Sequence, residues 1–307
     1  MSRLVRSYGA VVLAMIFWSF SFIWFKQANE TFRPVTIVFI RLVIAVFILT
    51  GYLIYTSRFV KIKKEDRKFF FLLALLEPFL YFIGESNGLT YVSATVGSVI
   101  ISTIPVIAAI GAWLIFRERL KIINYAGIIV SFLGVVVFIL NKDGSLSFNT
   151  KGLLLLNLAV FSAVGYNLTL TRLVGGYSPV YIVFVQNVIG SILFLPVFLA
   201  FEIQHLADTQ FVVKSFIPIL ELAFFASCGA FILFAGSVRN MGITRANVFT
   251  NFIPVFTAIF SIFIFGEKLT FQNIIGMIIV IAGLFMSQMK GQGTDVNKAL
   301  TLTGKTA

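Results

Sequence analysis

A series of apolar stretches, each long enough to cross a lipid bilayer as a helix, constrains this chain more than any other feature. A membrane-spanning helix needs about 20 predominantly apolar residues. The stretches are joined by polar connections that are too short to form a soluble domain. We therefore predict an all-α integral membrane protein with ten transmembrane helices. The predicted spans cover residues 8–27, 34–56, 69–88, 92–115, 122–140, 152–172, 179–203, 216–238, 242–265 and 272–289.

The composition agrees with this class and argues against several others. Hydrophobic residues make up 59% of the chain and charged residues only 12%, whereas a soluble domain carries about 25% charged residues. A single cysteine, Cys228, excludes an intramolecular disulfide and a thiolate-based metal site. The one histidine, His205, argues against a histidine-ligated metal centre. We expect no cofactor and no bound metal.

The basic residues predict how the helices are oriented. The chain has 24 Lys and Arg and a formal net charge of +12, and most of these residues lie in the connections on one side of the ten-span arrangement. Such a bias marks the cytoplasmic side. We therefore expect a multi-pass protein of the cell (inner or plasma) membrane with both termini in the cytoplasm. Its expected partners are membrane lipids and a small-molecule substrate, and not nucleic acid, because the basic segments lie at predicted membrane edges.

The two halves of the chain repeat one pattern. The segment Ile115–Leu120 (IFRERL) recurs as Ile264–Leu269 (IFGEKL). Matched Pro, Glu, Asn and Gly at a fixed spacing are not expected from chance similarity between apolar segments, so we predict a duplicated five-helix unit. The matched positions are Pro105 and Pro254, Asn124 and Asn273, Gly127 and Gly276, Gly134 and Gly283 and, at a slightly shorter spacing, Pro34 and Pro179.

The duplication predicts the domain organisation. We expect a first repeat at 1–140, a linker at 141–151, a second repeat at 152–289 and a disordered cytoplasmic tail at 290–307. Five spans are an odd number, so the second repeat must enter the membrane inverted relative to the first. Inverted repeats recur in secondary transporters, because two similar units of opposite orientation can exchange conformations. Inverted symmetry also occurs in channels, so a passive pore stays an alternative.

The repeated blocks resemble those of a known family, the EamA type of the drug/metabolite transporter (DMT) superfamily. The resemblance is carried by the Pro…Glu-Arg/Lys-Leu…Gly pattern of both halves and by the early pair Trp18-Ser19. It covers nearly the whole chain. It implies a ten-helix exporter of small metabolites, often amino acids or related compounds. It also implies a central cavity between the halves, with the fifth and tenth spans at the periphery.

The third span carries ionisable residues on one face. Glu77, Tyr81 and Glu85 are spaced i, i+4, i+8 and therefore share a helix face. An ionised side chain at mid-bilayer costs about 2.5–3.5 kcal/mol, so it should face a partner or a wet cavity. One hypothesis is a cavity-lining face that binds a substrate amine or carries a proton. The other is a structural ion pair with Arg41 of the second span. Arg41, Glu77 and Glu85 are thus candidates for charge or proton coupling.

The fourth and ninth spans carry matching polar stripes that lead to a mid-span proline. A proline frees the backbone carbonyl four residues earlier, which a substrate or water can use. We expect the stripes to line the cavity and the prolines to kink their helices, with plain helix packing as the alternative role. The stripe residues that we assign to substrate binding are Ser98 and Ser102 before Pro105, and Asn247 and Asn251 before Pro254.

The remaining site candidates are single residues. Trp18 and Ser19 in the first span, and Asn157 and Tyr166 in the sixth, occupy corresponding elements, and we expect them to bind substrate. Packing is the alternative role for Trp18. Glu221, a carboxylate near the outer end of the eighth span, is a further candidate for charge coupling and for lining the entrance.

The motif glutamates lead to a structural expectation. Glu118 and Glu267 sit at span boundaries. A carboxylate is favourable at a helix N-terminus, where backbone N–H groups lack partners. We therefore expect each of these glutamates to cap the helix that follows it.

These observations favour a secondary active transporter that exports small polar metabolites such as amino acids. Its inverted halves would alternate access to a cavity lined by the first, third, fourth, sixth, eighth and ninth spans. The residues form no recognisable catalytic constellation and no phosphate-binding loop, so we expect neither an enzyme nor direct coupling to ATP. A passive channel or facilitator with the same fold and a membrane-embedded lipid-modifying enzyme are the alternatives.

Overall fold

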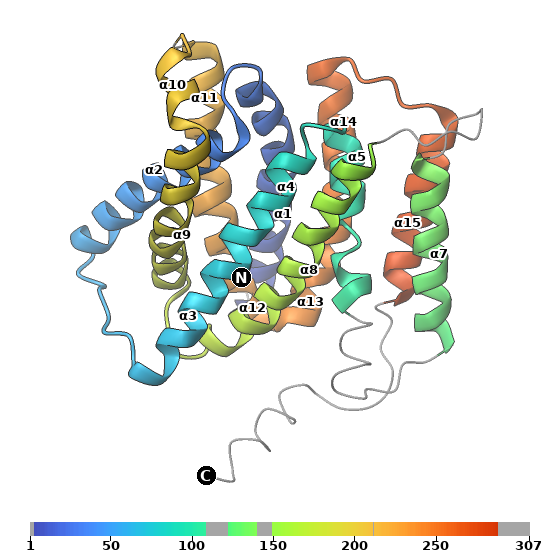
Figure 1. Cartoon of the computed structure of the whole chain (residues 1–307). Helices are drawn as coiled ribbons and strands as arrows, with labels where there is room; N and C mark the ends of the chain where they lie inside the picture. Colours follow the sequence, from blue (N-terminus) through green and yellow to red (C-terminus); the bar gives the residue numbers. More distant parts are fainter. Residues whose placement is uncertain (1–2, 109–121, 140–148, 211, 288–307) are drawn as a thin grey trace.

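The protein is helical throughout the part of the chain that its structure describes (Figure 1). The structure is a computed structural model that describes residues 3–108, 122–139, 149–210 and 212–287. Within these residues, seven helices are long and apolar enough to cross a membrane, and shorter apolar helices occupy the three remaining predicted spans. The prediction of an all-α membrane protein with ten hydrophobic helices is confirmed.

The element bounds follow the predicted spans closely. Most of the predicted linker, the predicted tail and the motif residue Glu118 lie outside the described residues. The first half contains α1 (Arg3–Asn29), α2 (Pro34–Tyr55), η1 (Lys64–Asp66), α3 (Arg67–Ala74), η2 (Leu75–Leu80), α4 (Tyr81–Gly88), α5 (Ala94–Ile101) and α7 (Ile122–Ile139). The second half contains α8 (Thr150–Leu173), α9 (Pro179–Phe201), α10 (Ile203–Asp208), α11 (Val213–Glu221), η3 (Leu222–Ala230), α12 (Phe231–Met241), α13 (Ile243–Val248), η4 (Phe249–Phe252), α14 (Ile253–Phe265) and α15 (Phe271–Ser287).

The repeated prolines explain where two helices begin. Pro34 and Pro179 are the first residues of α2 and α9, a position where the missing N–H costs nothing and the fixed φ favours the helix. The start of α2 is also capped from the other half. The carboxylate of Glu202, directly after α9, accepts a hydrogen bond from the backbone N–H of Thr36 at 2.6 Å. Both halves thus contribute to the start of α2.

The helices pack in contacts that the two halves share. α2 packs against α9, its counterpart in the second half. α1 packs against η3 and α12, and the equivalent contact is made by α8 against η2 and α4. One continuous hydrophobic core joins the two halves. A pseudo-twofold axis therefore relates the packing of the first half to that of the second half.

α7 and α15 lie side by side at one edge of the bundle (Figure 1). Near the start of α7, the side-chain amide of Asn124 donates to the carbonyl of Ser287 at the end of α15, at 3.0 Å. Near the start of α15, the amide of Asn273 donates to the carbonyl of Phe138 near the end of α7, at 2.8 Å. Each helix therefore begins where the other ends. Equivalent helices run antiparallel, as inverted repeats require, and this pair is peripheral.

Equivalent spans of the two halves are interrupted in equivalent ways. The third and eighth spans each contain a π-helical segment, η2 and η3, and such segments occur frequently at functional sites. Within η2, Glu77 departs from helical geometry, with φ −146° and ψ 118°. The fourth span is interrupted just before Pro105, and the 3₁₀ segment η4 precedes Pro254 in the ninth. Glu77 of η2 and Thr250 of η4 lie at the space between the halves.

Candidate functional site

A cavity with a volume of about 60 Å³ lies between the two halves. An ordered water molecule needs at least about 10–15 Å³, so this cavity has room for several. The first, third, fourth, sixth, eighth and ninth spans all contribute to its wall, as the sequence led us to expect. α2 adds one further residue, Arg41.

The charged residues of the cavity wall, Arg41, Glu77 and Glu85, all come from the first half. Each is less than a tenth exposed. The Nε of Arg41 donates a hydrogen bond to the hydroxyl of Ser227 at 2.9 Å, and its guanidinium carbon lies 4.2 Å from the centre of the Phe82 ring. Its positive charge attracts Glu85 and Glu77. Glu77 and Glu85 thus line the cavity within the electrostatic reach of Arg41, and their role in substrate binding, proton coupling or a structural pair stays a prediction.

The two glutamates are held differently. The hydroxyl of Tyr81 donates to Oε1 of Glu85 at 2.8 Å. Glu77 lies at the irregular turn of η2, and Glu85 and Arg41 are its charged neighbours. Within the described part of the chain, no donor is hydrogen-bonded to Glu77. The Glu77 carboxyl group therefore keeps its acceptor capacity for a ligand in the cavity.

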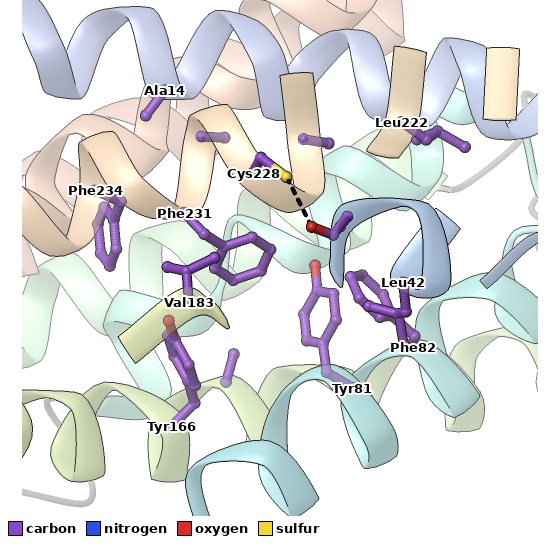
Figure 2. Packing of buried hydrophobic residues seen from close by; sticks show 14 of the residues in the cluster. Ala14, Leu42, Tyr81, Phe82, Tyr166, Val183, Leu222, Cys228, Phe231 and Phe234 are labelled. Carbon is purple, nitrogen blue, oxygen red and sulfur yellow. Dashed lines mark hydrogen bonds between the residues drawn. The ribbon is translucent and has the colours of Figure 1, made fainter. Parts of the chain in front are cut away.

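Aromatic rings form much of the remaining wall. The ring of Trp18 lies 5.3 Å from that of Phe231 and 5.1 Å from that of Phe234, between ring centres. The Tyr166 ring lies 6.0 Å from Phe231, nearly perpendicular to it. Figure 2 shows Tyr81 and Tyr166 rising from α4 and α8 toward the helix that carries Phe231 and Phe234. The cavity therefore has a charged side from the first half and a ring-rich side from α1, α8 and α12.

Oxygen acceptors from the ninth span complete the wall. Asn247 lines the cavity, and its buried Oδ1 has no hydrogen-bond partner within the described residues. The hydroxyl of Thr250 donates to the backbone carbonyl of Asn247 at 2.7 Å. In α1, the hydroxyl of Ser21 donates to the carbonyl of Trp18 at 2.6 Å. Because both hydroxyl protons are used within their own helices, the oxygen atoms present acceptors to the cavity.

Only part of the two polar stripes reaches the cavity. Asn247 lines it, but Ser98 and Ser102 do not. Their hydroxyls donate to backbone carbonyls within the fourth span, at 2.8 and 2.7 Å, which is how such side chains are commonly satisfied in a helix. The fourth span instead lines the cavity with Ile101 and Ile104. A substrate-binding role for Ser98 and Ser102 stays a prediction.

Four other candidates also lie outside the cavity wall seen in the described residues. Ser19 joins α1 to α14, because its hydroxyl lies 3.2 Å from the carbonyl of Ile253. Asn157 donates to a carbonyl of its own helix, and Asn251 is buried beneath the wall. Glu221 ends α11, partly exposed. Substrate binding by the first three and charge coupling by Glu221 stay predictions.

Glu267 contacts the start of a helix in the other half and does not cap the helix that follows it. Its two carboxylate oxygens accept hydrogen bonds from the hydroxyls of Ser93 and Thr95, both at 2.8 Å, at the start of α5 in the other half. The prediction that Glu267 caps the following helix, α15, is wrong. The reason is local: Thr270 and Asn273 hydrogen-bond to each other at the start of α15, which leaves the glutamate for α5.

Contacts with the second half hold both ends of α1. Near its end, Lys26 is attracted by the charge of Glu267. Near its start, the hydroxyl of Ser237 donates to the carbonyl of Ser7 at 3.1 Å, and the amide of Asn240 donates to the Ser7 hydroxyl at 2.9 Å. At 1.5 Å per residue, these two ends lie roughly 30 Å apart, with the cavity between them. The two halves are thus joined on both sides of the cavity.

Sequence reasoning missed several residues of the site, among them Phe82, Phe231, Phe234 and Ser227. The phenylalanines gave no usable signal, because the chain contains 36 Phe and rings that face lipid or a cavity look alike in sequence. Ser227 lies in a run of small residues at 226–230. Small residues mark close helix packing, so this run was the only sequence feature that could have placed Ser227 at a contact between helices.

Known proteins resemble the chain over nearly its whole length. The EamA-like transporter family matches it twice, at residues 6–140 and 150–289. Two uncharacterized transporters of Archaeoglobus fulgidus are similar: one is 27% identical over 282 residues, covering 92% of this chain and 98% of the relative, and the other is 25% identical, covering 93% and 98%. YetK, an uncharacterized transporter of Bacillus subtilis, is 27% identical over 72% of this chain and 68% of its own length.

A solved crystal structure shares the fold. It superposes with a TM-score of 0.69 over 94% of this chain and 99% of the other, at 13% sequence identity. The two family matches fall on the two five-helix halves, which agrees with the antiparallel pairing of α7 and α15. The protein is therefore a multi-pass membrane transporter with a cavity between two inverted repeats, and the chain belongs to the EamA-like transporter family.

Proposed function

We propose that this protein is a secondary active transporter that exports small polar metabolites, such as amino acids, by alternating access of its inverted halves. The observation that carries this proposal is the buried cavity with three charged residues at the interface of the halves. Charged groups inside a membrane are costly unless they face a partner or a wet cavity. Such a site between inverted repeats is where secondary transporters bind their substrates.

The contacts at the two ends of α1 suggest how access alternates. An outward-open state requires the Glu267 contacts with Ser93 and Thr95 to separate while the opposite end stays closed. An inward-open state requires the contacts of Ser7 with Ser237 and Asn240 to separate instead. Each set joins the two halves, so relative movement of the halves must break one set at a time.

Counterflow in proteoliposomes tests the carrier proposal. Vesicles loaded with an unlabelled amino-acid mixture should accumulate labelled amino acids from outside, and protein-free vesicles measure the leak. A carrier shows this stimulation by internal substrate, whereas a passive channel equilibrates both sides without it. A lipid-modifying enzyme would instead release a product from the vesicle lipids. Either of these outcomes contradicts the proposal.

A crosslink separates carrier movement from passive flow. In a Cys228→Ser background, the pair Ser93→Cys and Glu267→Cys can be joined by a short bifunctional thiol reagent, because the native side chains are in hydrogen-bond contact. Crosslinking should abolish counterflow, and cleavage of a reducible crosslink should restore it. Each single cysteine variant, treated identically, is the matched control. Unchanged counterflow after complete crosslinking would contradict alternating access at this end.

We also propose that both termini face the cytoplasm of a cell membrane. Glu30 and Glu65 are exposed and lie on opposite sides of the proposed topology. In intact cells lacking Cys228, a membrane-impermeant maleimide should label Glu30→Cys and leave Glu65→Cys unlabelled until the membrane is opened. The reverse pattern would invert the topology.

A further inference from the structure

We propose that the cavity selects a small organic cation: an amine of net charge +1 that carries a planar apolar group. This proposal rests on the proposed transport function and narrows its substrate class: among small polar metabolites, amines of net charge +1 should bind more tightly than zwitterionic amino acids. Three features of the wall support it, namely its net charge, its unpaired hydrogen-bond acceptors and its aromatic rings.

The charges of the wall do not balance. With both carboxyl groups ionised, Arg41, Glu77 and Glu85 sum to −1, and among the described residues the second half adds no charged residue to the wall. An unpaired charge buried in a membrane protein is unfavourable. A ligand of net charge +1 neutralises the site, as a proton on one carboxyl group does when the ligand is absent. A zwitterion leaves the imbalance, and an anion increases it.

The wall also offers unpaired acceptors to a donor ligand. Two of its donors, the Nε of Arg41 and the hydroxyl of Tyr81, are engaged with Ser227 and Glu85. The Glu77 carboxyl group and Oδ1 of Asn247 have no donor among the described residues. An ammonium group has three donors and no acceptor, which complements this wall.

The rings supply a surface for both parts of such a ligand. Trp18, Tyr166, Phe231 and Phe234 line the cavity within ring-contact distance of one another. An aromatic face attracts a cation and packs against an apolar group. A zwitterionic amino acid would instead need Arg41 for its carboxylate. That guanidinium already stacks over Phe82 at 4.2 Å and is anchored by Ser227.

Four probes that share a phenyl group and a short alkyl chain separate the ligand classes. They are phenethylamine (cation), phenylalanine (zwitterion), 3-phenylpropionate (anion) and 2-phenylethanol (neutral), each titrated into the purified transporter by calorimetry at neutral pH. We expect the Kd of phenethylamine to be at least about tenfold lower than that of any other probe. Equal or tighter binding of phenylalanine or phenylpropionate would overturn the proposal, as would no binding of phenethylamine at millimolar concentration.

Variants show whether the preference arises from this site. The Glu77→Gln variant should bind phenethylamine about tenfold more weakly and should no longer prefer it to 2-phenylethanol. The Glu77→Asp variant should retain part of this preference. Glu30→Gln makes the same chemical change at an exposed turn and should leave all four affinities unchanged. Melting temperatures without ligand identify any variant that fails to fold. An unchanged preference in a folded Glu77→Gln variant would overturn the assignment.

The same probes distinguish failure of this proposal from failure of the carrier proposal. Proteoliposome counterflow is measured with labelled phenethylamine and labelled phenylalanine, and leak is subtracted with protein-free vesicles. Selective phenethylamine binding without counterflow overturns the carrier and retains the cation site. Counterflow of phenylalanine without a preference for the amine retains the carrier and overturns the cation site.

Discussion

Arg41 of α2 and Ser227 of η3 join the two halves of the protein through a buried hydrogen bond of 2.9 Å. The backbone carbonyl of the same serine accepts a hydrogen bond from the amide of Asn187 in α9, at 3.3 Å. α2 and α9 are equivalent spans that pack against each other. The π-helical segment η3 therefore contacts both members of this pair through one small residue, and it sets the position of the buried guanidinium beside the cavity.

Removing the Ser227 hydroxyl should destabilise the protein. In Ser227→Ala, the buried Nε of Arg41 loses its acceptor, and a hydrogen bond to a charged group contributes about 1.5–3 kcal/mol. We expect a lower melting temperature in detergent and weaker ligand binding. Ser191→Ala is the matched control, because the Ser191 hydroxyl bonds to a carbonyl of its own helix and should cost less. An equal loss in the two variants would contradict a special role for Ser227.

Neutralising Glu267 should loosen the start of α5. The carboxylate accepts hydrogen bonds from the hydroxyls of Ser93, the N-cap of α5, and of Thr95, and a hydrogen bond to a charged group contributes about 1.5–3 kcal/mol. In Glu267→Ala, we expect faster hydrogen–deuterium exchange at the backbone amides of the first turn of α5. Exchange within α15 should stay unchanged, because Thr270 and Asn273 cap it locally. Faster exchange confined to the start of α15 would instead indicate that Glu267 caps α15.

Filling the contact between α7 and α15 should weaken their pairing. A Cβ added to Gly283 would come within 2.8 Å of the carbonyl oxygen of Gly127, and overpacking of this kind costs about 1–3 kcal/mol. Gly283→Ala should therefore lower the melting temperature. Gly236→Ala is the control, since a Cβ there would meet only Pro179, at 3.9 Å. Ligand affinity should be retained in both variants, because the α7–α15 pair lies outside the cavity wall.

Tyr177 joins the loop between α8 and α9 to η1, outside the membrane spans. Its hydroxyl donates to Asp66 at 2.7 Å and accepts from the backbone N–H of Lys63 at 3.1 Å. Burial raises the pKa of the Tyr177 phenol, and Asp66 raises the pKa further, while the Lys63 N–H opposes the shift. The neutral phenol is therefore the form that the folded state favours.

Tyr177→Phe should lower the stability by about 1 kcal/mol at neutral pH. The contribution of the phenol is present below the pKa of an unfolded tyrosine, and it is lost as the pH rises through the higher folded-state pKa. The difference in melting temperature between the two proteins should consequently shrink at strongly alkaline pH. Tyr55→Phe, at an exposed position, should match the parent at every pH. A difference that persists unchanged at high pH would contradict this account.

Several features of the fold could be predicted because they depend on local chemistry or on repetition. Pro34 and Pro179 begin helices because proline suits the first helical position. Asn124 and Asn273 recur at one spacing and prove to bond to each other's helices. Glu77, Tyr81 and Glu85 reach the cavity because residues four apart share a helix face and charge avoids lipid.

Other features depended on contacts between distant segments. Ser98 and Ser102 satisfy their hydroxyls within the fourth span, and sequence alone does not show which polar groups are already satisfied. The aromatic wall was invisible, because Phe231 and Phe234 look like lipid-facing rings until the halves are docked.

By itself, the sequence determined the membrane class, the ten spans and the inverted duplication, because bilayer thickness and helix periodicity act on each segment independently. Only the tertiary structure decided that Arg41 meets Ser227, that Glu267 bonds to Ser93 at the start of α5, and that the charged residues share a cavity with rings of both halves. Such contacts depend on how two apolar surfaces interlock. Many apolar sequences can form each surface, so the pattern along the chain does not reveal the partner.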